Sequence, residues 1–334
     1  MALRLLEMVL RETDSDDVRK LLIDCNVIEY RQIRLPDGEV LVRILLDAEQ
    51  TETVLDLLDR RYTGAEGNRV VVLPVEATLP RAEAAPPAAP GQPPAEEPPP
   101  ERIGREELYE DIKNGARLSP VYLAMVVLST IVAAIGLYTN SVAIIIGAMV
   151  IAPLLGPNMA LSLGTTLGDL RLLRQALVTV LAGVAATMVL SVVFGVLLQV
   201  SEASPEIVSR SSVGFGDIAV ALASGSAGAL AFTTGVSAAL IGVMVAVALL
   251  PPLVTCGLLL GAGDLGLAFG AMALFLVNLI CVNLAGMTTF LVQGIKPTSW
   301  WEKERATKAT RVAIALSVAL LAVLVAMIIL MQHR

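Results

Sequence analysis

The chain has 334 residues, of which 55 % are hydrophobic and only 16 % are charged, and its mean hydropathy is +0.74. In a typical soluble domain about a quarter of the residues are charged, so this composition excludes an ordinary cytosolic enzyme. The net charge of −7, without a basic stripe that carries interleaved aromatic residues, argues against nucleic acid as a partner.

Charged residues are concentrated at the two ends of the chain. Between residues 118 and 293 there are eight: Asp169, Arg171, Arg174, Glu202, Glu206, Arg210, Asp217 and Asp264. This distribution predicts a soluble head joined to a polytopic α-helical membrane body. The N-terminus has no long apolar run followed by a cleavage site, so we expect no signal peptide and a cytoplasmic head.

Residues 1–79 predict a small cytoplasmic α+β domain. Residues rich in β-formers alternate with two helical patterns, and Pro36-Asp37-Gly38 marks a hairpin turn between the second and third strands. The four predicted strands are residues 2–10, 27–35, 39–46 and 69–75, and the helices follow residues 14 and 47. The order βαββαβ is that of a ferredoxin-like fold. Such a domain either binds a regulatory ligand or partner, or only helps assembly, and the fold does not decide between these roles.

A linker and a short helix connect the head to the membrane body. Residues 80–100 are rich in proline and alanine, which is typical of an extended polyproline-II spacer. Residues 101–118 predict a juxtamembrane amphipathic helix with Ile103, Leu108 and Ile112 on its apolar side. This helix either lies on the cytoplasmic membrane surface or forms a simple stalk.

Seven apolar stretches are each long enough to cross a bilayer. They fall at residues 119–139, 140–167, 171–199, 217–234, 236–262, 266–293 and 311–331. We therefore divide the body into a first three-span repeat, an extracytoplasmic loop, a second three-span repeat, a cytoplasmic loop, and a seventh span with its tail. These five parts are residues 119–200, 201–216, 217–293, 294–310 and 311–334.

An internal repeat supports this division. Residues 143–169 align with residues 238–264 at a constant offset of 95, and 11 of the 27 positions are identical. The shared patterns G-x-M-V, L-L-x-P and G-D are more specific than shared leucines. Three spans per unit invert the second unit relative to the first, which is the plan of many transporters. In an alternative model, spans two and five are re-entrant hairpins and only five spans cross.

The positive charges set the expected orientation. With the head in the cytoplasm, Arg171, Arg174 and the lysines of residues 294–310 face the cytoplasm, and the C-terminus lies outside. We expect a homo-oligomer in the cytoplasmic membrane of a bacterium or archaeon.

Paired prolines in spans two and five predict a mid-membrane site. Proline removes a backbone donor and clashes with the preceding turn, so both helices should kink or break. The freed backbone groups then either line a wet pathway or only shape helix packing. The candidate pathway residues are Pro153, Gly156, Pro157, Asn158, Pro251, Pro252, Thr255, Asn278 and Asn283.

The remaining charges in the body lie at the expected helix ends. Asp169, Asp264 and Arg210 are candidate gate or vestibule charges, although solvation at helix ends is the favoured interpretation of the two aspartates. The only histidine is His333, and neither a metal-ligand cluster nor a nucleophile–base pair is visible. We therefore expect no enzyme activity, no metal and no cofactor.

Three stretches of the body resemble a known family. GAMVIAPLLGPNMALSLG, SRSSVGFGDIAVALASGSAGALAF and GVMVAVALLPPL are similar to the bacterial and archaeal membrane family catalogued as domain of unknown function 389. The resemblance covers residues 119–293 and, more loosely, the head. It implies the membrane architecture and leaves the substrate open.

Two functions from different classes follow from these patterns. The first is a transporter or channel for a small ion or polar solute, with a regulatory or assembly head. The second is a membrane-anchored sensor or scaffold, in which the head binds a ligand or partner and the body only anchors it in the lipid bilayer.

Overall fold

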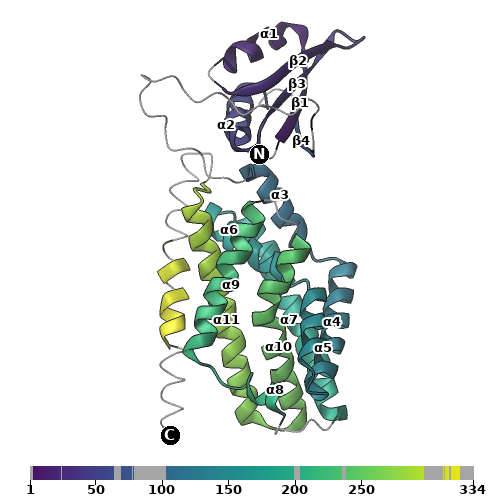
Figure 1. Ribbon diagram of the computed structural model, residues 1–334, viewed down its shortest axis with the longest axis vertical. Coiled ribbons are helices and arrows are strands. Elements are labelled where there is room, and N and C mark those ends of the chain that lie inside the picture. The colour runs from purple at the N-terminus through teal and green to yellow at the C-terminus, as the bar shows by residue number, and fades with distance from the viewer. Residues whose placement is uncertain are drawn as a thin grey trace. The chain divides into compact units, whose positions relative to one another are not determined.

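The structure is a computed structural model (Figure 1). It describes residues 3–23, 25–63, 69–76, 78, 103–198, 204–234, 238–296, 311, 313–315 and 317–323. The predicted linker at residues 80–100 and most of the loop at residues 294–310 lie outside the described residues. The chain divides into two compact units, Met1–Leu108 and Tyr109–Arg334.

The first unit contains a four-stranded antiparallel sheet. Its elements are β1 (Leu3–Arg11), α1 (Glu12–Leu21), β2 (Val27–Arg34), β3 (Glu39–Asp47), α2 (Ala48–Leu58), a π-helical turn (Asp59–Thr63) and β4 (Val70–Val75). The strand order is β2-β3-β1-β4, and every neighbouring pair is antiparallel. The predicted βαββαβ order is confirmed. Helix α1 begins earlier than predicted because it follows β1 directly at Glu12.

The core of this unit follows from the period-two pattern of the strands. Alternate residues of β1 and β3 turn toward the two helices and are almost fully buried, as Leu6 and Val42 illustrate. Val18 of α1, and Val54 and Leu58 of α2, complete the same cluster. Both helices therefore cover one face of the sheet.

The second unit is helical. Helix α3 (Arg105–Gly115) crosses the boundary between the units and is followed by α4 (Pro120–Tyr138), α5 (Val142–Ile151), α6 (Leu155–Leu167), α7 (Leu170–Leu198), α8 (Pro205–Val208), α9 (Phe215–Thr233), α10 (Ala238–Ala262) and α11 (Leu265–Val292). By length and apolar composition α4, α7, α9 and α11 are long enough to cross a membrane, and α5 with α6 forms a bent pair. The described residues thus support four spans, or five with the bent pair, and the seven-span count stays a prediction.

Two equivalent turns end α6 and α10. Gly168 and Gly263 adopt φ angles of 70° and 93°, in the left-handed region that favours glycine. The carboxylates that follow cap the next helices: Asp169 accepts the Leu172 N–H at 3.1 Å, and Asp264 accepts the Leu267 N–H at 2.9 Å. Both aspartates therefore have a structural role at helix N-termini.

The proline pairs have different effects in the two repeats. The chain bends by 54° between α5 and α6, where Pro153 lies in the gap and Pro157 lies in the first turn of α6. In contrast, α10 continues through Pro251 and Pro252 as one helix, so of the predicted kink or break in span five the break is wrong. At the repeat offset of 95, Ala248 replaces Pro153 in α10, and alanine keeps the backbone donor that proline lacks.

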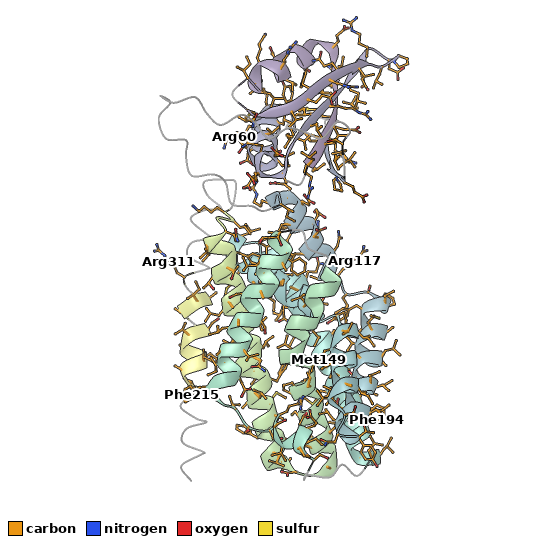
Figure 2. The ribbon with its side chains drawn as sticks, in the orientation of Figure 1. Arg60, Arg117, Met149, Phe194, Phe215 and Arg311 are labelled. Atoms are coloured by element: carbon orange, nitrogen blue, oxygen red, sulfur yellow. The ribbon has the colours of Figure 1, made fainter. Side chains whose placement is uncertain are left out.

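Helices of the first predicted repeat pack against helices of the second. Within the bundle, α6 packs against α11 and α10 packs against α7. Figure 2 places Arg117, just before α4, toward one end of the bundle, and Phe215, the first residue of α9, toward the other end. The two helices that open the predicted repeats therefore run in opposite directions.

Candidate functional site

A cluster of neutral polar side chains joins α6 to α11. The Asn283 side-chain N–H donates to Oδ1 of Asn158 at 3.2 Å, and the Ser162 hydroxyl lies 3.2 Å from Oδ1 of Asn283. Asn158 and Ser162 are buried, with 2 % and 0 % of their surface exposed, and Asn283 is half-buried. We call these three residues the amide cluster.

The helix break positions this cluster. Asn158 lies in the first turn after the gap, and its side-chain N–H donates to the carbonyl of Leu154, inside that gap, at 2.7 Å. Pro153 has no N–H to donate to the Met149 carbonyl four residues earlier. This carbonyl accepts instead from the Ala152 N–H at 3.3 Å. Backbone groups freed by proline are thus satisfied locally, as an apolar environment requires.

A glycine lets the two helices of this cluster approach closely. A Cβ built on Gly286 of α11 would lie 2.7 Å from the Ser162 hydroxyl oxygen and 3.0 Å from its Cβ. A larger residue at position 286 would therefore push α11 away from α6 and open the amide cluster.

The contact between α7 and α10 is built differently. Ser191 and Gly195 of α7 face Gly257 and Gly261 of α10, both in small-x-x-x-small spacing, with the helix backbones in contact. Among the side chains that the structure describes, the buried hydroxyls of Ser191 and Thr255 have no hydrogen-bond partner. This contact is held by packing, whereas the amide cluster is held by side-chain hydrogen bonds.

Helix α3 meets the helical body beside the break. The backbones of Gly115 and Gly156 are in contact, and the Thr179 hydroxyl donates to the Ala116 carbonyl at 2.8 Å. Ile112 and Ala116 are fully buried. The C-terminal half of α3 therefore packs on protein.

Asp169 also anchors α3. The Tyr109 hydroxyl donates to Oδ2 of Asp169 at 2.6 Å. Burial alone would raise the pKa of Asp169, but the Tyr109 hydroxyl and the N–H groups of Leu172 and Arg171 outweigh it and lower this pKa. Burial, together with the bond to Asp169, raises the pKa of Tyr109 to about 12. The carboxylate is therefore ionised and the phenol neutral at neutral pH.

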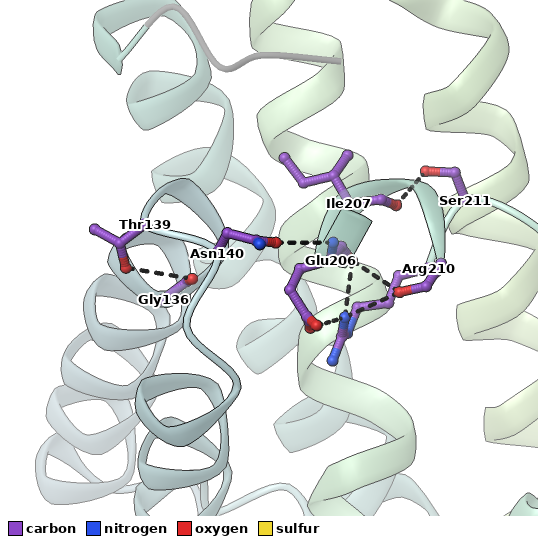
Figure 3. A network of polar contacts seen from close by, with 8 residues as sticks. Gly136, Thr139, Asn140, Glu206, Ile207, Arg210 and Ser211 are labelled. Atoms are coloured by element: carbon purple, nitrogen blue, oxygen red, sulfur yellow. Dashed lines mark hydrogen bonds and ion pairs between the residues drawn. The ribbon is translucent and has the colours of Figure 1, made fainter. Parts of the chain in front are cut away.

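Arg210, one of the candidate gate or vestibule charges, is paired within its own loop. It forms an ion pair with Glu206 and donates to the Glu206 carbonyl at 2.8 Å (Figure 3). The Asn140 side chain accepts the Glu206 N–H at 3.1 Å, which ties α8 to the turn that follows α4. Arg210 thus stabilises the loop that contains α8.

The other predicted pathway residues are not members of the amide cluster. Pro251, Pro252 and Thr255 are buried in α10. Asn278 is buried in α11, but it precedes Asn283 by five residues and points about 140° away around the helix. The predicted residues that the structure brings together are Asn158 and Asn283, close to the break at Pro153, Gly156 and Pro157.

The amide cluster presents neutral oxygen and nitrogen atoms as hydrogen-bonding groups and contains no charged side chain. No group of three or more His, Cys, Asp or Glu side chains suited to a metal ion occurs within the described parts of the chain. Any ion bound at the cluster would be held by amide, hydroxyl and carbonyl oxygens.

Comparison with known proteins identifies the family. A family model described as Domain of unknown function (DUF389) matches residues 149–284. An uncharacterized protein of Methanocaldococcus jannaschii is 41 % identical over 288 residues, which is 86 % of this chain and 87 % of that protein. The chain belongs to the DUF389 family. No solved structure matches it.

The DUF389 segment contains the whole amide cluster, including Ser162, which the sequence analysis missed. The repeat offers a signal for Ser162, because the offset of 95 pairs it with Gly257, another small residue at a helix contact. No sequence pattern indicates Tyr109, because it belongs to no motif and its partner Asp169 is 60 residues away.

Proposed function

We propose that this DUF389 protein is a membrane transport protein, a carrier or channel, with two inverted repeats that separate at the amide cluster to pass a small ion or polar solute. The observation that carries this proposal is the amide cluster itself. It is buried, uncharged and adjacent to a helix break, and it lies between a helix of the first predicted repeat and a helix of the second.

Equivalent contacts support the repeat. Adding 95 to Ser162 gives Gly257, and subtracting 95 from Gly286 gives Ser191. Ser162 contacts Gly286, and Gly257 contacts Ser191. The same pair of equivalent positions therefore meets twice, once with each repeat supplying each position. This exchange is what a two-fold axis between the repeats produces.

Contacts within each predicted repeat agree with the same offset. The Thr130 hydroxyl lies 3.3 Å from that of Thr187, joining α4 to α7. At the equivalent positions Gly225 packs on the backbone of Val282, joining α9 to α11. In addition, α4 and α9 are both 19 residues long and begin 95 residues apart. Their opposite directions in Figure 2 favour an inverted repeat.

Neutral groups suit a transport pathway through an apolar body. Amide and hydroxyl groups exchange hydrogen bonds with a passing solute without the desolvation cost of a buried charge. The three side chains of the amide cluster bond mainly to one another and to their own helices, so they can close the path when no solute is present.

The test is flux through the full-length protein in liposomes. We expect uptake of at least one of four probes, K⁺, Na⁺, Cl⁻ or glycerol, above protein-free liposomes. Asn283→Leu should reduce that flux at least tenfold, because it removes the central donor and acceptor of the cluster. Thr288→Val is the matched control, since Thr288 is exposed on the same helix and bonds only to its own backbone. Folded wild-type protein that passes none of the probes would contradict the proposal.

The second candidate is a membrane-anchored sensor or scaffold. Its favouring observation is the internal satisfaction of the amide cluster, which a purely structural contact would also show. In that case Asn283→Leu lowers stability, no probe crosses the membrane, and a ligand or partner binds the N-terminal sheet domain.

A further inference from the structure

A groove on the outside of the bundle combines cationic and apolar residues. It has a volume of about 350 Å³ and is lined by Leu118, Arg171, Arg174, Gln175, Val178 and Thr179. Four of the lining residues form one stripe along α7, because they follow the spacing i, i+3, i+4 and i+7: Arg171, Arg174, Gln175 and Val178. The stripe begins with two guanidinium groups and ends with aliphatic carbon.

The charges of the groove are only partly compensated, because Arg171 interacts with the Asp169 carboxylate. Within the described residues neither Arg171 nor Arg174 forms an ion pair, and both side chains are exposed. Asp169 is the acidic group beside Arg171, and its carboxylate is occupied by Tyr109 and by two backbone N–H groups. Arg174 therefore remains available to an external anion, with Arg171 beside it.

The same face of α7 continues as apolar surface. Val178 is 48 % exposed and Leu181, one turn further along, is 57 % exposed, while Leu118 borders the groove at 41 %. Helix α7 has 29 residues and is about 43 Å long, which exceeds a hydrocarbon core of about 30 Å. Its first turns can therefore lie at headgroup level while Val178 and Leu181 face acyl chains.

We propose that this groove binds one membrane lipid with an anionic phosphate headgroup. The phosphate contacts Arg174 and Arg171, with Gln175 beside them, and the acyl chains lie along Val178 and Leu118. A cationic pocket that continues into an exposed apolar helix face fits a phospholipid better than a free anion, because a free anion makes no use of the apolar part. The site is separate from the amide cluster and does not depend on transport.

Native mass spectrometry of the full-length protein in detergent tests this proposal. We compare phosphatidylglycerol with phosphatidylcholine of the same chain length, and we expect phosphatidylglycerol to bind about tenfold more tightly. Arg171→Gln/Arg174→Gln should reduce its binding to the phosphatidylcholine level, whereas Arg171→Lys/Arg174→Lys should retain most of it. Arg117→Gln is the matched control, because Arg117 is exposed one residue before Leu118 and does not line the groove.

Three results would overturn the proposal. The first is unchanged phosphatidylglycerol binding by the double glutamine variant. The second is an equal loss in Arg117→Gln, which indicates diffuse surface charge. The third is displacement of the lipid by inorganic phosphate at matching concentration, which indicates a free-anion site. Arg174→Gln alone provides a folded comparison, because no described hydrogen bond depends on the Arg174 side chain.

Discussion

Gly156→Ala tests whether α3 packs against the helix break. A Cβ at position 156 would lie 2.5 Å from the carbonyl oxygen of Gly115, 2.8 Å from its carbonyl carbon and 3.1 Å from its Cα. All three atoms belong to the backbone, so α3 or α6 must move by nearly 1 Å to restore ordinary contact. Overpacking of this kind costs about 1–3 kcal/mol, and the better helix propensity of alanine offsets up to about 1 kcal/mol. We expect a net loss of about 1–2 kcal/mol, or about 3–6 °C in melting temperature.

Buried cysteines provide the assay. Cys256 and Cys281 are 2 % and 0 % exposed, so a thiol-reactive fluorophore labels them only when the bundle opens. A Cys25→Ser background removes the half-buried thiol of the first unit. Gly147→Ala is the control, because a Cβ there meets nothing within 4 Å, and it should leave the melting temperature unchanged or slightly higher. If Gly156→Ala melts at or above the control, the packing of α3 on the break is wrong.

Three further predictions use the same melting assay. Asn283→Leu should lower the free energy of unfolding by about 1 kcal/mol, the usual size of a hydrogen bond between membrane helices, and Thr288→Val should change it by a few tenths of a kcal/mol at most. Equal losses in the two variants would mean that the amide cluster does not stabilise the α6–α11 contact. The raised pKa of Tyr109 stabilises the fold below pH 10, and wild-type protein should lose this stability as the pH rises from 10 to 12. Tyr109→Phe should therefore flatten the dependence of melting temperature on pH in that window. Gly168→Ala and Gly263→Ala should each cost about 1–2 kcal/mol because both positions have positive φ, and a near-zero cost at either would contradict that turn.

The sheet domain could be predicted from sequence because the buried positions of β1 and β3 recur at every second residue. Leu6, Leu10 and Val42 occupy inward positions that a period of two identifies directly. The Pro36-Asp37-Gly38 turn then fixes which strands pair first, and Gly38 has the positive φ that such a turn uses. The start of α1 was less accessible, because the capping-type residues from Asp14 onward lie inside the helix and Arg11, the actual N-cap, makes no side-chain cap bond.

The break between α5 and α6 was predictable and the continuity of α10 was not. Pro153 and Pro157 are one turn apart, so they remove donors from two successive turns. Pro251 and Pro252 are adjacent, so their missing donors fall in the same turn and the helix continues around them. Sequence identity at Pro157 and Pro252 therefore concealed a difference that depends on the neighbouring proline.

Asn158 and Asn283 were recognised because an amide in an apolar span needs a partner, yet sequence alone could not pair them. They are 125 residues apart, and their meeting depends on α6 packing against a helix of the other predicted repeat. The equivalent position of the repeat has no amides, since Leu253 corresponds to Asn158 and Met188 to Asn283 at the offset of 95. One contact is therefore closed by backbone packing of Ser191 and the glycines, and the other by side-chain hydrogen bonds. In the proposed transport motion, the repeats pivot at the packed contact and open at the amide cluster. Flux should therefore fall in variants at Asn283 by more than their loss of stability alone explains.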